Sequence, residues 1–393
     1  MACVARIVAV ASAAAFMAGS AASGSGAAAP ACARSVSSVP LGLPAPVRIT
    51  TTCAIYTVFP SGRIRVGARP LRVDAGITAM LVAGPGATVV QRGARIAVLR
   101  GGRAVFRSRG HFRAAGVFAL IGPRAVAFGY ENYESLATEA LYVAPLHGDE
   151  REIGQGERPL GWTRGGALLT TCASGVCLRD STGALLRRLR TRVREVRFEP
   201  ARSSLLALSH SGVLERYDEH WHRLRDLRTL GFGDQVSFEP LAGGLIGVLE
   251  GRHVAVLRAD GSLFASSWFR ARRGAFSVAG ESGLVANAAG GAVAFAVTIG
   301  DNGGGRGSES LYVLHAGDRR ASKLYGAAIN FVICERWASV AWHRNWLLYA
   351  TPEGRTLVLD TRGGAGRIDL SGLIHRLAGR DAEGKMTAQV SWS

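Results

Sequence analysis

The chain has 393 residues and a formal net charge of +18, from 47 Lys and Arg against 29 Asp and Glu. Hydrophobic residues make up 48 %, which excludes a chain that is disordered by composition. Lys323 and Lys385 are the two lysines, so 47 − 2 = 45 basic residues are arginines. These arginines are scattered, whereas phosphate-binding proteins cluster mixed Lys and Arg, so we expect no specific nucleic-acid partner.

Residues 1–33 have the three-part layout of a secretory signal peptide. A single charge precedes an apolar run from Ile7 to Ala18, and small residues follow. A run of about a dozen residues is short for a transmembrane helix, which needs roughly 20. We expect cleavage after Ala31 or Ala33, then a short linker over residues 34–46. The mature chain is expected to be secreted or held in the cell envelope, without a transmembrane segment.

Cys32 lies at the cleavage region and raises the question of a lipid anchor. Lipoprotein signals usually have Leu three positions before the modified cysteine, and this chain has Ala29 there. We therefore expect no lipid anchor at Cys32. The competing interpretation of the leader is a disordered, Ala-rich segment without a targeting role.

Four cysteines follow the leader, an even number that suits an oxidising compartment. Cys172 and Cys177 flank a tight Ala-Ser-Gly turn between two strand-like runs. This spacing predicts a disulfide across the hairpin if the two positions face each other. Elimination then leaves a bond between Cys53 and Cys334. A Cys-x4-Cys pair alone lacks the second ligand pair of a zinc site, so we expect no metal.

A β-hairpin pattern recurs along the chain: a β-rich run, a polar or Gly-rich turn, then a second run. The starts of successive copies lie roughly 35 to 57 residues apart. The copies span residues 55–66, 95–106, 141–153, 176–189, 213–227, 254–268, 311–324 and 356–370.

Seven of these hairpins are preceded by two further strand-like runs. Residues 235–268 give the clearest case, with the runs QVSFEP, GGLIGVLE, HVAVLRAD and GSLFASSW. The stretch from Val193 repeats this plan, including a Phe-Glu-Pro ending at 198–200 that recurs at 238–240. Four strands in about 40 to 45 residues are typical of a β-propeller blade.

On these repeats, residues 45–393 resemble the WD40-like and TolB-like β-propellers of bacterial envelopes. No Gly-His…Trp-Asp motif is present, so the resemblance concerns architecture. It implies an all-β fold of four-stranded blades, with residues 47–393 as one domain. A two-sheet sandwich with a second domain is the competing fold, but it leaves the repeat unexplained.

The two ends of the chain are expected to share a blade. Residues 41–52 leave no room for two strands before the first hairpin, and the final MTAQVSWS is one unpaired strand. Pairing the N- and C-terminal strands closes the ring and removes its open edges. Seven full repeats and this composite predict eight blades. Seven blades are the alternative, because residues 270–291 are weakly patterned.

One candidate binding segment is residues 129–140, read as a long loop between strands. Tyr130, Glu131, Tyr133 and Glu134 lie in it, and long loops at one mouth of a propeller commonly carry binding residues. The competing interpretation is an ordinary solvated loop.

A second candidate is the tryptophan cluster ERWASVAWHRNW, with Trp342 and Trp346 as ligand-stacking residues. The competing interpretation is packing in the core of a blade. His220 and His222 lie two apart on an expected strand and so on one face, but a solvated face explains them better than a metal site.

No catalytic motif is found: Gly-x-Ser-x-Gly, the Walker loop and His-Glu-x-x-His are absent from the sequence. We therefore expect an exported, non-enzymatic, monomeric propeller without a cofactor, which binds a protein or an anionic envelope polymer. The alternatives are a propeller lyase or hydrolase with a site at the central channel, and a carbohydrate-binding module that uses the tryptophan cluster.

Overall fold

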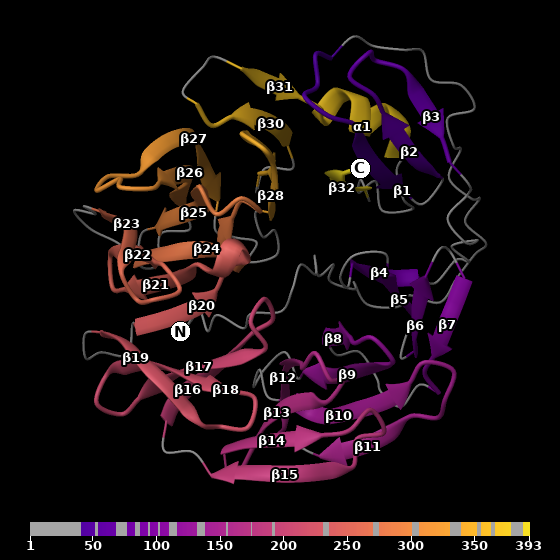
Figure 1. Cartoon of the computed structure of the whole chain (residues 1–393). Coiled ribbons are helices and arrows are strands. Elements are labelled where there is room, and N and C mark those ends of the chain that lie inside the picture. The colour runs from indigo at the N-terminus through magenta and orange to yellow at the C-terminus, as the bar shows by residue number, and fades with distance from the viewer. Residues whose placement is uncertain are drawn as a thin grey trace. The chain divides into compact units, whose positions relative to one another are not determined.

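Figure 1 shows the computed structural model of the chain. It describes residues 41–51, 54–67, 77–82, 87–92, 95–100, 103–109, 116–131, 138–154, 156–173, 175–190, 193–230, 236–269, 275–300, 306–330, 339–351, 355–362, 366–378 and 388–393. These fall into two compact units. The first takes the described residues of 77–270 and 314–321, and the second those of 41–76, 271–313 and 322–393. The expected signal peptide lies outside the described residues.

The described residues form 32 strands in eight four-stranded antiparallel sheets. In seven sheets the strands follow one another in chain order, which is the up-and-down plan of a propeller blade. The chain is thus all-β and of the β-propeller class. The expectation of eight blades, rather than seven, is confirmed within the part of the chain that is described.

Five sheets belong to the first unit. Their strands are β4 (Ile77–Val82), β5 (Ala87–Arg92), β6 (Arg95–Arg100), β7 (Arg103–Arg107), β8 (Gly116–Ile121), β9 (Ala125–Glu131), β10 (Thr138–Pro145), β11 (Arg151–Gly154), β12 (Arg158–Trp162), β13 (Leu168–Cys172), β14 (Gly175–Arg179), β15 (Leu185–Arg190), β16 (Val193–Glu199), β17 (Ser204–Ser209), β18 (Val213–Asp218), β19 (Arg223–Thr229), β20 (Val236–Pro240), β21 (Ile246–Glu250), β22 (His253–Leu257) and β23 (Leu263–Trp268). The short 3-10 helix η1 (Ala242–Gly244) lies between β20 and β21.

Three sheets belong to the second unit, apart from the tip of one hairpin. Their strands are β1 (Val47–Thr51), β2 (Ile55–Val58), β3 (Ile64–Val66), β24 (Ala275–Ala286), β25 (Ala292–Gly300), β26 (Arg306–His315), β27 (Ser322–Asn330), β28 (Ser339–His343), β29 (Trp346–Ala350), β30 (Thr356–Asp360), β31 (Arg367–Asp369) and β32 (Ala388–Trp392). The helix α1 (Ser371–Ala378) follows β31.

The middle strands of the sheets are apolar on both faces. All five residues of β22 are buried, and so are five of the six residues of β17. Strands covered on both faces read as continuous apolar runs instead of alternating ones. The core therefore lies between consecutive sheets: one cluster joins β17 and β18 to β20, β21 and β22, and another joins β25 and β26 to β29 and β30.

In the first unit, a hairpin turn of one sheet packs on the last strand in chain order of the preceding sheet. The turn between β10 and β11 donates from the His147 amide to the Val105 carbonyl of β7, at 3.1 Å. The tip of the β26–β27 hairpin donates from the Gly317 amide to the Phe264 carbonyl of β23, at 2.8 Å. These bonds satisfy backbone groups on strands that would otherwise be open edges.

Tryptophans make a similar link between edge strands of neighbouring sheets, namely the first strands or, in the composite sheet, β32. Trp162 of β12 donates its indole N–H to the Leu120 carbonyl of β8, at 3.0 Å. In the second unit, Trp342 of β28 donates to Val285 of β24 at 2.7 Å, and Trp392 of β32 donates to Ala341 of β28 at 3.1 Å. A buried indole N–H needs such an acceptor.

The composite sheet runs in the order β3-β2-β1-β32, as expected from the two ends of the chain. Val47 of β1 pairs with Trp392 of β32, and Thr51 pairs with Ala388. Residues 41–52 supply one strand, β1, to this sheet. The weakly patterned stretch 270–291 contains β24, the first strand of its sheet, whose register with β25 shifts between Ala279 and Leu284.

Candidate functional site

A pocket of about 220 Å³ opens in the second unit beside the turn between β28 and β29. Its walls come from three separate parts of the chain: the segment before β1, the β28–β29 turn and the turn after β30. The lining residues are Pro44, His343, Arg344, Asn345, Trp346 and Arg362.

The β28–β29 connection is a two-residue turn. His343 pairs with Trp346, which leaves Arg344 and Asn345 as the loop. Arg344 has φ of +52°, a left-handed conformation that side chains other than Gly adopt infrequently. The Asn345 carbonyl accepts bonds from the amide and the hydroxyl of Thr361, both at 2.9 Å. The two turns of the pocket are thereby tied to each other.

Aromatic rings make the inner wall of the pocket. Trp346 is half-buried and packs against the apolar cluster formed by the composite sheet, β29, β30 and α1. The His343 ring lies 5.2 Å from that of Trp392, with an angle of 41° between the planes. The Trp392 indole N–H is bonded to the Ala341 carbonyl, so the ring that supports His343 is itself held in place.

The rim of the pocket carries two guanidinium groups, one paired with a carboxylate and one not. Arg362 binds Asp360 through two bonds, Nε to Oδ1 at 3.0 Å and Nη2 to Oδ2 at 2.8 Å. The bonds from Arg362 lower the pKa of Asp360, so this carboxylate stays ionised and neutralises Arg362. Arg344 is exposed, and no described residue forms a hydrogen bond or an ion pair with its side chain. The pocket therefore presents net positive charge beside an indole.

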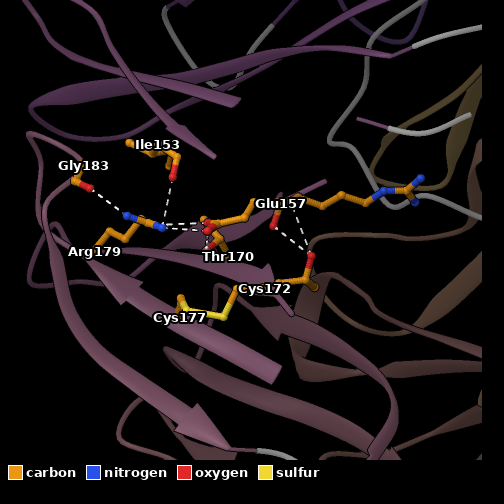
Figure 2. The surroundings of a disulfide bond; sticks show 9 residues. Ile153, Glu157, Thr170, Cys172, Cys177, Arg179 and Gly183 are labelled. Atoms are coloured by element: carbon orange, nitrogen blue, oxygen red, sulfur yellow. Dashed lines mark hydrogen bonds and ion pairs between the residues drawn. A yellow bond between two sulfur atoms is a disulfide. The ribbon is translucent and has the colours of Figure 1, made fainter. Parts of the chain in front are cut away.

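The Cys172–Cys177 disulfide is present, with a Cα–Cα distance of 6.0 Å. Figure 2 shows it bridging neighbouring strands, and the register places Thr170 opposite Cys177 and Gly175 opposite Cys172. The two cysteines are thus a diagonal pair on one face of the sheet rather than directly opposite. Cys53 and Cys334 lie outside the described residues.

A buried ion pair lies beside the disulfide (Figure 2). Arg179 binds Glu157 through Nη2 at 2.6 Å and Nε at 3.1 Å, and Thr170 donates to the same carboxylate at 2.9 Å. Arg179 also donates to the Gly183 carbonyl at 2.9 Å and the Ile153 carbonyl at 3.2 Å. With its donors used in this way, the pair holds strands together and is not open to a ligand.

No family model and no curated protein matches the chain. Similar solved structures include BamB from Moraxella catarrhalis, at 15 % identity over 83 % of this chain and 98 % of that chain, with a TM-score of 0.44. KlHsv2 with loop 6CD replaced by a Gly-Ser linker has 11 % identity, coverage of 70 % and 89 %, and a TM-score of 0.46. The β-propeller domain of Cps50 (Swd1) from Myceliophteria thermophila has 14 % identity, coverage of 75 % and 98 %, and a TM-score of 0.43.

Of the two tryptophans expected at a site, Trp346 lines the pocket and Trp342 does not. The Trp342 indole is used in the bond to Val285, and its ring packs against the cluster around Tyr349. Tyr130 and Glu131 are the last two residues of β9 and so belong to a strand instead of a loop. Tyr133 and Glu134 lie outside the described residues.

The sequence interpretation missed most of the pocket. His343, Arg344 and Arg362 carry no motif, and Pro44 lies about 300 residues before them. One local signal was available: a polar pair between two strand-forming runs, at Arg344 and Asn345, marks a hairpin turn. It cannot show which other segments meet that turn.

The described residues contain no group of three His, Cys, Asp or Glu side chains placed to hold a metal ion. His220 and His222 lie in the turn before β19 and not on a strand as expected. His222 Nδ1 lies 2.8 Å from the Asp218 carboxylate, which also accepts both histidine backbone amides. In the part of the chain that is described, no helix has the length and apolar character of a membrane span.

Proposed function

We propose that the protein is an exported, non-catalytic propeller that binds an anionic group of a protein or of an envelope polymer. The pocket beside β28–β29 carries this proposal, because it joins the Trp346 ring to an Arg344 guanidinium that no described residue neutralises. An aromatic surface next to a free cation suits a ligand that is partly apolar and negatively charged.

The size of the pocket favours one group of a large partner over a free small molecule. Its volume of about 220 Å³ lies below the range of roughly 300–1,000 Å³ typical of small-molecule sites. One carboxylate-bearing side chain or one sugar ring is of the right size. The backbone of Arg344 has a left-handed conformation, and residues in such strained conformations are common at binding sites.

Two observations support an extracytoplasmic location. The first 33 residues have the layout of a signal peptide. The Cys172–Cys177 disulfide needs an oxidising compartment to persist. Cell fractionation followed by thiol alkylation tests this: we expect the protein outside the cytoplasm, with these two cysteines protected until they are reduced. Free thiols at both positions in the exported protein would contradict the proposal.

The binding proposal is tested with two polyanions, poly-glutamate as an acidic-protein mimic and poly(glycerol phosphate) as an envelope-polymer mimic. Isothermal titration compares the native protein with Arg344→Glu. A hydrogen bond to a charged group contributes about 1.5–3 kcal/mol, so we expect Arg344→Glu to weaken binding by about 10- to 100-fold. The probe that binds more tightly decides between a protein and a polymer partner.

Arg376→Glu is the matched control, because Arg376 is exposed on α1 in the same unit and its substitution changes the net charge equally. We expect Arg376→Glu to bind nearly as the native protein does. If both variants weaken binding to the same degree, attraction comes from the diffuse field of the +18 chain and the pocket is not the site.

A further inference from the structure

A second surface, in the first unit, presents an exposed tryptophan. Trp268 ends β23 and is 70 % exposed, the largest exposed fraction among the bulky apolar side chains that the structure describes. Its ring lies parallel to the ring of His253, with centroids 4.4 Å apart and 13° between the planes. His253 is itself buried and pairs with Trp268 across the β22–β23 ladder. The histidine therefore supports one face of the indole and leaves the other open.

The tip of the β26–β27 hairpin, residues 314–321, lies along the outer edge of β23. The Ser266 amide donates to the Asp318 carbonyl at 2.9 Å, and the Ala321 amide donates to the Ser267 hydroxyl at 3.0 Å. These bonds bring the backbone of Arg319 and Arg320 next to the end of β23. Both arginines are exposed, and no described residue forms a hydrogen bond or an ion pair with either side chain.

We propose that Trp268, Arg319 and Arg320 form a binding surface for an anionic glycan. The open indole face stacks on the apolar face of a sugar ring, and the guanidinium groups bind the acid group of that sugar or of its neighbour. This surface is separate from the pocket beside β28–β29 and goes beyond the function proposed for that pocket.

The orientation of the indole favours a glycan over a lipid surface. A ring that inserts into a membrane projects from the protein end-on, whereas Trp268 lies flat on His253 and offers a face. Charge complementarity favours an acidic sugar over a neutral one, because the exposed Arg319 and Arg320 lie in the hairpin tip that is bonded to the end of β23. The support from His253 fixes the ring before binding, which lowers the entropy lost on association.

The experiment uses the full mature chain with a galacturonate tetramer, a neutral glucose tetramer and vesicles of anionic phospholipid. Calorimetry measures the two sugars, and co-sedimentation measures the vesicles. We expect Trp268→Ala and Arg319→Glu/Arg320→Glu each to weaken binding of the galacturonate tetramer by at least about tenfold. The neutral tetramer is expected to bind more weakly than the acidic one.

Matched controls separate this surface from general effects. Leu263→Ala removes another exposed apolar side chain of β23, and Arg187→Glu/Arg188→Glu makes the same charge change on β15. We expect these control variants to bind the galacturonate tetramer within about twofold of the native protein. Native protein and variants are also compared with Arg344→Glu added to each, so that the pocket is disabled and the remaining binding reports on the Trp268 surface alone.

Any one of three results would overturn the inference. The first is that the native protein does not bind the galacturonate tetramer, and the second is that Trp268→Ala binds it as tightly as the native protein does. The third is that Trp268→Ala loses vesicle binding while its sugar binding is unchanged. The last result would assign the surface to lipid. Because Trp268 is exposed, we expect its variants to keep the native circular dichroism spectrum.

Discussion

At the scale of single residues, Gly261 decides how closely two sheets approach in the first unit. It lies in the β22–β23 turn with φ of +88°, and a Cβ built there would meet the Leu227 carbonyl oxygen of β19 at 2.2 Å. The neighbouring Ala259 carbonyl accepts a bond from Arg216, which is itself paired with the buried Glu199. Because Gly261 has no side chain, its turn can pack against Leu227, and this places the Ala259 carbonyl where it accepts the bond from Arg216.

We predict that Gly261→Ala lowers the free energy of unfolding by about 2–4 kcal/mol, from backbone strain and from the clash together. Equilibrium denaturation in urea measures the loss. Gly317→Ala is the matched control, since Gly317 has φ of +86° in an equivalent turn but no atom within 4 Å of an added Cβ. Equal losses in the two variants would show that the approach of Leu227 does not matter.

Tyr217 should titrate late. Burial, and then its 2.7 Å bond to Glu215, raise the pKa of Tyr217 to about 12, against about 10 in an unfolded chain. Because the folded pKa is the higher one, this group's contribution to stability is fully present below pH 10 and is lost as the pH rises through about 12.

Ultraviolet difference titration of the native protein against Tyr217→Phe checks this prediction. The variant keeps the ring that stacks on Trp221 at 4.2 Å, so the difference isolates the hydroxyl. A tyrosinate signal that develops near the ordinary pKa of tyrosine would contradict the prediction.

At the scale of elements, tryptophan N–H groups link edge strands of consecutive sheets, which are the first strands in chain order or, in the composite sheet, β32. Trp162 on β12 is the example in the first unit: its N–H bonds to Leu120, and its ring lies where a Cβ on Gly122 would come within 2.6 Å. The same kind of bond recurs at Trp342 and Trp392 in the second unit. This chain lacks the Gly-His…Trp-Asp motif, but a tryptophan N–H bond between neighbouring sheets recurs in it.

We predict that Trp162→Phe lowers the unfolding free energy by about 1–3 kcal/mol, because the Leu120 carbonyl loses its donor while an aromatic ring stays in place. Thermal unfolding followed by circular dichroism measures the effect. Trp268→Phe is a control, since that exposed indole belongs to no such link. A stability unchanged by Trp162→Phe would mean that the indole bond contributes nothing beyond ring packing.

The last strands of two sheets carry a regular share of exposed arginines. Along the sequence the arginines are scattered, but Arg187 and Arg188 lie on β15 and Arg223, Arg225 and Arg228 on β19, each the last strand of its sheet. These side chains are exposed or half-exposed. Charge on outer strands opposes edge-to-edge pairing with other chains. The periodic repeat of sheets, and not a focused basic patch, distributes this charge.

The sequence predicted the hairpins because apolar runs and turn residues alternate within a short window. It predicted β24 poorly because Gly280, Glu281 and Gly283 interrupt its apolar pattern at the register shift. The helix α1 was missed, because its eight residues make only about two turns, too few for a helical pattern of apolar residues to stand out in the sequence. The pocket was missed for another reason: Pro44 and Arg362 meet the β28–β29 turn only through the tertiary fold.

At the scale of the whole molecule, the pairing of β1 with β32 joins the two ends of the described chain. Five residue pairs form this ladder, and Val390 and Trp392 pack against the cluster beneath the composite sheet. Without β32, β1 would be an open edge with unpaired backbone groups. We therefore expect β32 to stabilise the whole composite sheet and the apolar cluster beneath it.

We predict that deletion of residues 388–393 lowers the unfolding free energy by about 3–5 kcal/mol, because the partly buried Trp392 and five ladder pairs are lost together. Differential scanning calorimetry measures the fall in Tm. A synthetic peptide of residues 388–393 should restore part of the loss by adding a strand to the open edge. The same peptide with Trp392→Ala should not. An unchanged Tm in the truncated protein would refute the prediction.

The β1–β32 pairing also sets an order in time. β1 ends at Thr51 and β32 begins at Ala388, so the 336 residues 52–387 separate the partners. Contacts this distant in sequence form late, because a long loop must close before they bring any gain. In a chain that emerges N-terminus first, β1 can pair with β2 early, but its other edge stays open until β32 has been made. During that interval this edge can pair with other chains, so the first strand of the sheet is exposed to aggregation for the longest time.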